Sequence, residues 1–342
     1  MTPVMTSLET VRHNDAALEI IQQAGGRVAT RALTEFAERD WEAEMYLDVW
    51  VGKYASNVAE HYHEILRAPH IGPLKNALSA KPCAVAVVGA GPSLDRNAEV
   101  LHDFPGIIIA CDRAAKALTA RNIKPDMVVC VDPRPAVMAE MLNYPENREQ
   151  VLILSVLADP EVPRVWRGKK FYMSTLHPGT QFFDRVLPEL FPGMPMLFAC
   201  GNVGNTAVQM AEWLGAKKIV LVGQDYGYTG GRVACDDWVR FPNGAWARAR
   251  RTAAEDAILL AKRTGKIMIE DVETYGPFVS YRDTLAEMAR EWKLDVVNAT
   301  EGGIIKVFPQ QALSDVAQDL RAAKYQAKEA HALLDKATGG IS

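Results

Sequence analysis

The feature that most constrains this fold is a set of six short apolar segments that lack the polar alternation of a half-exposed strand. They are Ala84–Gly89, Gly106–Cys111, Met127–Val131, Val151–Val156, Met196–Cys200 and Lys218–Gly223. Helical patterns between several of them predict crossover connections, and strands joined by crossovers pair in parallel. The sequence therefore predicts an α/β fold with a doubly wound, mostly parallel, Rossmann-like sheet.

Helical patterns dominate on both sides of this predicted core. Residues 1–80 are polar and carry aromatic residues at mostly helical spacing from Trp41 to Tyr62, which indicates a packed helix. After Asp236 the pattern is mostly helical over 245–265 and 281–293, then gives one short strand and an Ala-rich amphipathic helix over 310–337. We expect an N-terminal helical region (1–80), a Rossmann-like nucleotide-binding catalytic core (81–303) and a C-terminal helical tail (304–342).

Composition excludes several classes of protein. The chain has 342 residues and a formal net charge of −4, so no overall charge draws it to nucleic acid or to anionic membrane. Its apolar runs are too short to span a bilayer, and its start lacks the basic and apolar segments of a signal peptide. The five cysteines form no CxxC pair, which favours buried, reduced thiols. We expect a cytoplasmic protein without a membrane span or a nucleic-acid partner.

The turn after the first predicted strand reads Gly-Ala-Gly-Pro-Ser and is a candidate nucleotide contact. Ligands of such sheets bind beyond the carboxyl ends of the strands. Gly89 and Gly91, followed by Pro92, would let the backbone approach a phosphate or base, and Ser93 suits a helix cap or a phosphate contact. Asp112, at the next strand end, could hold a ribose. The alternative is a tight structural turn, and the lack of a G-x-x-x-x-G-K-[ST] motif excludes a P-loop.

Three further candidates follow the next predicted strands. Asp132 could bind a metal or a sugar hydroxyl, and Arg134 could bind a phosphate. Because one Asp is a poor metal site by itself, Mg²⁺ stays a candidate cofactor and no more. His177 lies in the segment "STLHPGTQ" and is a candidate general base. The alternative is that it is a structural histidine.

The segment after the fifth predicted strand reads "GNVGNT". Gly201 and Gly204 would again permit close approach of a ligand, and Asn202 and Asn205 carry both donors and acceptors that suit a base or sugar. Thr206 would cap the next helix. The alternative is a capped helix start without a ligand role.

Polar residues also follow the last two predicted strands. Gln224, Asp225 and Tyr226 precede a glycine-rich loop that could close over a substrate. Asp225 is, with His177, a candidate base for the proton of an acceptor hydroxyl. Asn298 and Thr300 would fold back toward the same pocket, or would only cap a turn. A glycosyl donor's leaving phosphate would be stabilised by helix N-termini at Ser93 and Gly204.

Four sequence blocks resemble successive blocks of the motility accessory factor (Maf) family, which also includes 6-hydroxymethylpterin diphosphokinase MptE-like proteins. They are "GAGPSLD", "ALTARNIKPDMVVCVDP", "GNVGNTAVQMAEWLGAKKIVLVGQDYGYTGG" and "VVNATEGG", in the family's order between 82 and 303. Maf proteins are taken to transfer a nonulosonic, sialic-acid-like sugar from its CMP donor to Ser or Thr of flagellin. The resemblance implies a CMP-sugar glycosyltransferase, with Gly89, Gly91, Ser93 and Asn205 near the CMP and Asp225 and Tyr226 near the sugar or acceptor.

The sequence departs from these relatives at several points. Bacterial sialyltransferases resemble the same blocks but use a histidine after the strand that corresponds to Lys218–Gly223, and this chain has no histidine between His177 and His331. The chain is shorter than typical Maf proteins, so the acceptor stays open between protein Ser/Thr and a small molecule, and an oligomer stays open too. The second hypothesis is an ATP- and Mg²⁺-dependent diphosphokinase of the MptE-like type. The third is a non-catalytic nucleotide-binding module.

Overall fold

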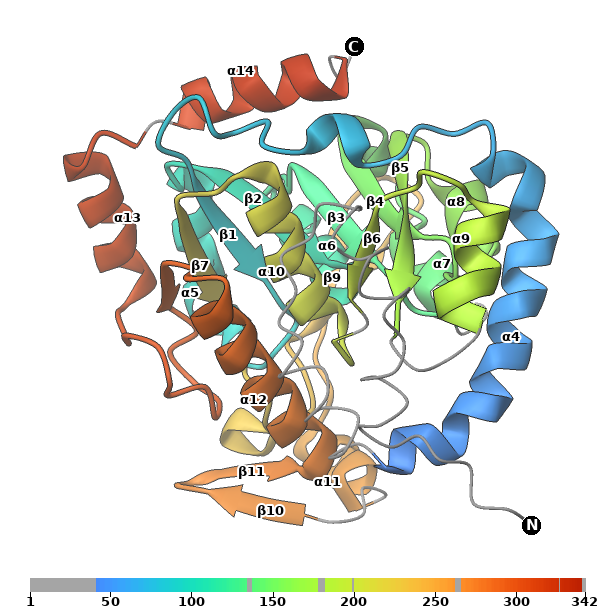
Figure 1. Ribbon diagram of the computed structural model, residues 1–342. Helices are drawn as coiled ribbons and strands as arrows, with labels where there is room; N and C mark the ends of the chain where they lie inside the picture. The colour runs from blue at the N-terminus through green and yellow to red at the C-terminus, as the bar shows by residue number, and fades with distance from the viewer. Residues whose placement is uncertain are drawn as a thin grey trace.

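The computed structural model describes residues 41–342, except 134–136, 178–181, 199, 262–265, 326 and 340–342. Its centre is an eight-stranded sheet in which every pairing is parallel (Figure 1). The strands are β1 (Ala84–Val88), β2 (Ile107–Cys111), β3 (Met127–Cys130), β4 (Val151–Ser155), β5 (Lys169–Leu176), β6 (Met196–Phe198), β7 (Lys218–Val222) and β12 (Val296–Asn298). The predicted Rossmann-like α/β architecture is confirmed.

The order of the strands, β12-β7-β1-β2-β3-β4-β5-β6, determines where a ligand can enter. The chain builds β1 to β6 outward in one direction, and α10 (Val203–Leu214) then returns it to β7 on the other side of β1. The direction of winding therefore reverses between β1 and β7. In open α/β sheets the crevice at this reversal, at the carboxyl ends of the strands, is the usual ligand site.

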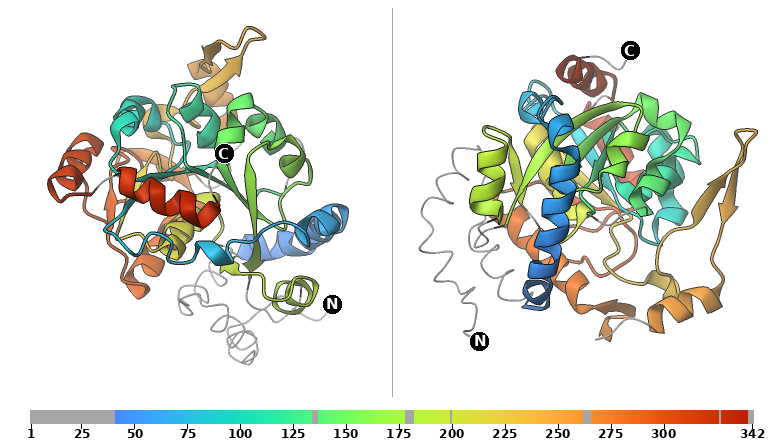
Figure 2. Two further views of the ribbon diagram at one scale, coloured as in Figure 1. Left: turned by 90° about the horizontal axis from the view of Figure 1, so that it is seen from above. Right: turned by 90° about the vertical axis from the view of Figure 1, so that its right-hand side faces the viewer.

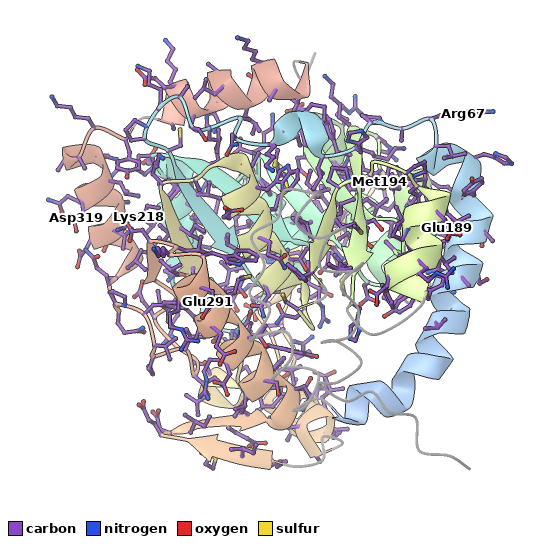
Figure 3. All side chains as sticks on the ribbon, in the orientation of Figure 1. Arg67, Glu189, Met194, Lys218, Glu291 and Asp319 are labelled. Carbon is purple, nitrogen blue, oxygen red and sulfur yellow. The ribbon has the colours of Figure 1, made fainter. Side chains whose placement is uncertain are left out.

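Two apolar layers sandwich the sheet, because alternate residues of each strand face opposite sides. In β1, Val85 and Val87 belong to one core, whereas Ala84, Ala86 and Val88 belong to the other. The first core contains α10, α12 (Gly276–Glu291) and α14 (Ala327–Thr338). The second contains residues of α4 (Trp41–Ile65), α5 (Leu94–Asn97), α6 (Asp112–Thr119), α7 (Val137–Leu142), α8 (Glu161–Val165), α9 (Leu187–Leu190) and α13 (Leu313–Ala322). Figure 3 shows side chains filling both layers, with Lys218 marking the amino end of β7.

Short helical turns connect several of these elements. They are η1 (Gly72–Leu74), η2 (Ala98–Asp103), η3 (Pro145–Glu149), η4 (Phe182–Val186) and η5 (Thr229–Gly231). A helix begins after Ser93, as predicted, but α5 has only four residues before η2 begins, so its dipole is small. Phosphate stabilisation at this helix start stays a prediction.

The region after β7 contains strands where the sequence predicts a helix. β8 (Asp237–Arg240) and β9 (Trp246–Ala249) form one antiparallel hairpin, and β10 (Lys266–Ile269) and β11 (Val272–Tyr275) form another. Only α11 (Ala253–Ala261) remains of the helix predicted over 245–265. The ring centroid of Trp246 lies 6.5 Å from that of Tyr144, and Trp238 and Trp246 pack against the second core, so tertiary contacts override local helix propensity here.

Two further predictions need correction. Strand β5 begins with Lys169 and Lys170, which are half-exposed, and this polar start hid it in the sequence. The helix predicted over 310–337 is two helices, α13 and α14, separated by Lys324 in the left-handed conformation (φ 63°). Lys324 N donates to Arg321 O and ends the first helix, as a left-handed residue commonly does.

Helix α4 is the described part of the predicted N-terminal helical region; residues 1–40 lie outside the described residues. Asn57 Nδ2 donates to Pro133 O and to Leu157 O, both at 3.0 Å, so α4 packs over the loops that follow β3 and β4. Within the described chain, no helix has both the length and the apolar composition needed to cross a bilayer. All five cysteines are buried and free, as predicted.

Candidate functional site

The turns after β1 and β7 are joined by a direct contact at the point where the winding reverses. Ser93 Oγ donates to Asp225 Oδ2 at 2.5 Å, and Ser93 N donates to Asp225 Oδ1 at 3.2 Å. Ser93 is fully buried and Asp225 is 2% exposed. Burial raises the pKa of the Asp225 carboxyl, and the hydrogen bonds from Ser93 act against that shift. The two predicted site segments are therefore one physical unit.

The predicted ligand-contacting glycines instead face neighbouring loops of the same chain. A Cβ at Gly89 would lie 2.6 Å from Gly223 O, and a Cβ at Gly91 would lie at the same distance from that oxygen and still closer to Asp225 Oδ2. Neither position leaves room for a side chain. The absence of side chains lets the turns after β1 and β7 pack together, which is a sufficient reason for both glycines.

The start of α10 belongs to the same unit. Asn202 caps the helix, because its Oδ1 accepts from Asn205 N at 2.9 Å. Tyr226 OH donates to Asn205 Oδ1 at 2.7 Å, and Asn205 Nδ2 donates to Cys200 O and Tyr281 O at 3.1 and 3.0 Å. These bonds use the buried Asn205 amide within the chain, so it holds the site together rather than facing a ligand.

Asn202 differs from Asn205 in its exposure and in its bonding. Asn202 is half-buried as a residue, but its Nδ2 atom is buried and has no hydrogen-bond partner among the described residues. Gly201 beside it is exposed and left-handed (φ 78°). Thr206 lies inside α10, where its Oγ1 donates to Asn202 O at 3.3 Å, so the predicted cap at Thr206 is wrong and Asn202 is the cap. Asn202 is therefore the member of the "GNVGNT" segment with an unpaired, buried donor.

The loop after β12 folds back onto the same turns, in the place predicted for it. Thr300 Oγ1 accepts from Gln224 N at 3.2 Å, and Ile304 N donates to Asp225 O at 2.8 Å. Asn298 Nδ2 donates to Ile305 O at 2.7 Å, and its Oδ1 accepts from Thr300 N at 3.0 Å. Asn298 and Thr300 are buried and support the loop that holds Asp225.

Three carboxylates surround Cys130 at the ends of β2, β3 and β4. Burial raises the pKa of the Cys130 thiol well above its ordinary value, and the negative charges of Asp112, Asp132 and Asp159 raise it further. Asp159 was missed, although "ADP" after the fourth strand repeats the "VDP" that contains Asp132. The described residues include no group of three His, Cys, Asp or Glu placed to hold a metal. Arg134 lies outside the described residues.

The two predicted catalytic residues lie in different parts of the sheet. Asp225 follows β7 and His177 follows β5, with β1 to β4 between those strands. Neighbouring strands are spaced by about 4.8 Å, so the two strand ends are about 24 Å apart. His177 packs near Phe183, with 5.6 Å between ring centroids. The structure does not bring Asp225 and His177 together.

An aromatic surface that sequence reasoning missed lies beside Asn202 and Asn205. Tyr226 and Tyr228 face the start of α12, where Tyr275 and Phe278 meet at 4.5 Å between centroids. Tyr275, Phe278 and Tyr281 remain partly exposed. Partly exposed rings next to amide donors suit stacking with a base or a sugar. Only the spacing of Tyr275, Phe278 and Tyr281 along one helix could have indicated this surface.

Comparisons with known proteins agree with this architecture. The family model described as 6-hydroxymethylpterin diphosphokinase MptE-like matches residues 56–231. The solved structure of the Maf glycosyltransferase from Magnetospirillum magneticum AMB-1 is similar, with a TM-score of 0.50 and 19% sequence identity over 84% of this chain and 44% of that chain. This chain thus spans less than half the length of that protein, and at such identity the likeness concerns the fold. A search of curated proteins gives no match.

Proposed function

Because the chain belongs to the 6-hydroxymethylpterin diphosphokinase MptE-like family, we propose that it is a transferase that binds a nucleotide-activated donor at the carboxyl ends of β1, β2 and β7. The observation that carries the proposal is the reversal of winding between β1 and β7, where the Ser93–Asp225 contact fixes both turns. Polar and aromatic groups from distant segments converge there.

The proposed donor is a CMP-activated nonulosonic sugar. The Maf-like sequence blocks support this donor, and the solved protein with a similar fold is named a glycosyltransferase. In this proposal the buried, unpaired Asn202 Nδ2 becomes a donor to the base or sugar when the ligand enters, and the partly exposed rings of Tyr275 and Phe278 stack on it. Asp112 lies one strand from the reversal, in the position that suits a ribose hydroxyl. The acceptor is a Ser/Thr of a protein or a small molecule.

Asp225 remains the proposed base, with a specific condition. An acceptor hydroxyl that replaced Ser93 Oγ would donate to Asp225 Oδ2, which is the contact a general base needs. Burial raises the pKa of Asp225 and makes its carboxylate a stronger base. His177 is too far from Asp225 to act in the same proton transfer, so it is proposed only as a base for a substrate bound near β5.

A second candidate function is pyrophosphoryl transfer from ATP. The family model carries the description of a diphosphokinase, and Asp112, Asp132 and Asp159 each act on the Cys130 thiol, although the described residues form no three-ligand metal group. Mg²⁺ often binds through one or two carboxylates together with substrate phosphates. Asp112 and Asp132 are the residues that would hold it, and the ion would neutralise phosphate charge.

A thermal-shift series with CMP, ATP and cytidine, each in EDTA and in Mg²⁺, tests the proposal. CMP at a hundredfold excess over its Kd should stabilise the protein by about 2.7 kcal/mol in EDTA. Asn202→Ala should weaken CMP binding, whereas Asn243→Ala, a change in the distant β8–β9 turn, should not. Stabilisation by ATP only with Mg²⁺ would select the diphosphokinase. If a nucleotide binds but no acceptor is turned over, the third hypothesis, a non-catalytic nucleotide-binding module, is favoured. If no nucleotide binds at all, the proposed site is refuted.

A further inference from the structure

A cluster of arginines lies beside the turn after β1 and is used by neither proposed role above. It consists of Arg121, Arg232, Arg248 and Arg250 around the carboxylates of Asp95 and Asp236. The cluster adjoins the candidate site, because Cys235 N donates to Ala90 O at 2.9 Å in the Gly89–Gly91 turn. It joins α5 and α6 to the β8–β9 hairpin, which projects from the body in both views of Figure 2.

The two carboxylates hold the arginines in fixed positions. Asp95 Oδ2 accepts from Arg232 Nη1 and from Asp236 N, both at 2.8 Å, and Asp95 Oδ1 pairs with Arg121. Asp236 Oδ1 accepts from Arg232 Nη2 at 2.5 Å. Arg248 pairs with Asp236 as well, and Arg250 Nε lies 3.8 Å from the same carboxylate. Arg232 therefore bridges two anions, and Asp236 has three guanidiniums within 4 Å.

The charges of this cluster do not balance. Four guanidiniums face two carboxylates, so two positive charges are in excess. The nearby anions are already paired: Asp237 with Lys116 at 3.5 Å and Asp256 with Arg251 at 3.0 Å. Crowding of like charges is unfavourable unless a further anion joins them.

The excess charge faces solvent on one side. The Asp95 and Asp236 side chains are 5% and 0% exposed, whereas those of Arg248 and Arg250 are 48% and 64% exposed. Residues 236, 248 and 250 lie on one face of the hairpin, because Trp238 pairs with Arg248 and strand residues alternate. The buried carboxylate thus presents two guanidiniums outward, next to the turn after β1.

We propose that Arg248 and Arg250, positioned by Asp236, bind a phosphate group of the nucleotide. A guanidinium offers a planar fork of donors that matches phosphate oxygens, and two forks held on one anchor lose little freedom on binding. The inference rests on the proposed nucleotide site and adds its phosphate-binding residues. Arg134, which lies outside the described residues, stays a separate prediction of a phosphate contact.

Calorimetric titration with inorganic pyrophosphate tests this binding without a nucleoside. The variants are Arg248→Ala, Arg250→Ala, both together, and Arg250→Lys, with Arg290→Ala as control, since Arg290 is 63% exposed and pairs with Glu291 elsewhere. We expect the double variant to bind pyrophosphate at least about tenfold more weakly, as loss of charged hydrogen bonds implies. The affinity of Arg250→Lys for pyrophosphate should lie between those of the wild type and Arg250→Ala. The affinity of the Arg290→Ala control should equal that of the wild type.

Parallel titrations with CMP and cytidine separate this inference from the proposed function. One outcome is that the double variant loses the extra affinity that the wild type has for CMP over cytidine while it binds cytidine as before. That result would support both the arginine phosphate site and the proposed nucleotide site. If it binds pyrophosphate and CMP as the wild type does, the inference fails and the nucleotide site survives. If pyrophosphate binding depends on the arginines but no nucleoside or nucleotide binds the wild type, the anion site stands and the proposed function fails. Should Arg248→Ala unfold, Arg250→Ala alone decides, because that side chain is mostly exposed.

Discussion

The carboxyl and amino ends of the sheet are built in opposite ways. At the carboxyl end, the turns after β1, β7 and β12 interlock through Ser93, Asp225 and Thr300, with glycines at each close approach. At the amino end, a cavity of about 450 Å³ remains beneath α14. Its lining mixes apolar residues with ion pairs, including His331–Asp126 at 3.0 Å and Lys124–Glu149 at 3.3 Å.

This difference shows that residue type at a strand end does not by itself identify a ligand contact. Glycines and buried amides at the carboxyl end are used to pack loops against each other. The groups left for a ligand are Asn202, the partly exposed rings of α12 and the arginine cluster. Interlocked turns are rigid, and a rigid support is what precise ligand positioning requires.

The largest expected effect is that of Gly91→Ala. Its Cβ would lie 2.6 Å from Gly223 O and closer still to Asp225, whose carboxyl is fixed by Ser93. We expect a loss of about 3 kcal/mol in the free energy of unfolding, the scale of overpacking in a core. Gly276→Ala is the control, because a Cβ there meets nothing within 4 Å. Equal urea denaturation midpoints for the two variants would mean that the turns are looser than described.

Removal of the Asp225 carboxyl should have the next largest effect. Asp225→Ala strands the buried donors of Ser93, so we expect a loss of about 2 kcal/mol, and Asp225→Asn should lose less. Ser93→Ala combined with Asp225→Ala should be less destabilising than the sum of the single changes, since both remove one contact. Additive losses in urea denaturation would contradict a direct coupling.

The pH dependence of the same variants sharpens this prediction. Burial raises the folded pKa of Asp225 above its ordinary value of 3.8, so the folded state binds more protons than the unfolded state above that pH. The stability of the wild type relative to Asp225→Asn should therefore fall as pH rises from 3.8 through the raised pKa. A relative stability that rises with pH over this window would show that the hydrogen bonds outweigh burial.

The smallest effect is expected at the amino end, from His331→Gln. The hydrogen bond that His331 Nε2 donates to Asp126 raises the pKa of His331, aided by the charge of Asp335 and opposed by burial and Lys124. The stabilisation of the fold by the His331–Asp126 pair is therefore fully present below the ordinary histidine pKa of 6.5. It is lost as the pH rises through the raised pKa of His331. Because His331 is 44% exposed, we expect at most about 1 kcal/mol at pH 5.5 and none at pH 9 by thermal denaturation, with His102→Gln as control.

If His331→Gln lowered the stability at pH 9 as much as at pH 5.5, the ion pair with Asp126 would not be the cause of the loss. A loss at pH 5.5 comparable with that of Gly91→Ala would contradict the contrast between the two ends, because α14 would then be held as firmly as the interlocked turns.

Strand patterns in the sequence predict the sheet well because buried parallel strands need apolar residues on both faces. All six predicted strands exist; five of them end one to two residues before the predicted end, whereas β2 ends at Cys111 as predicted. The MptE-like resemblance is confirmed by the family model, and the Maf glycosyltransferase of known structure has a similar fold. The strand β5 and both hairpins were missed; the polar start of β5 at Lys169 and Arg248 within β9 disguise strands that are partly exposed. The region boundaries at 80 and 303 stay predictions.

The sequence by itself determined the class of fold, the parallel sheet and the end at which polar residues gather, because burial on two faces and strand-to-helix turns depend on local composition. Only the tertiary structure decided what those residues touch. It joined Ser93 to Asp225, separated His177 from both, and set Arg248 and Arg250 beside the first turn. Such contacts join residues more than a hundred positions apart, and their geometry depends on strand order and packing, which no local pattern encodes.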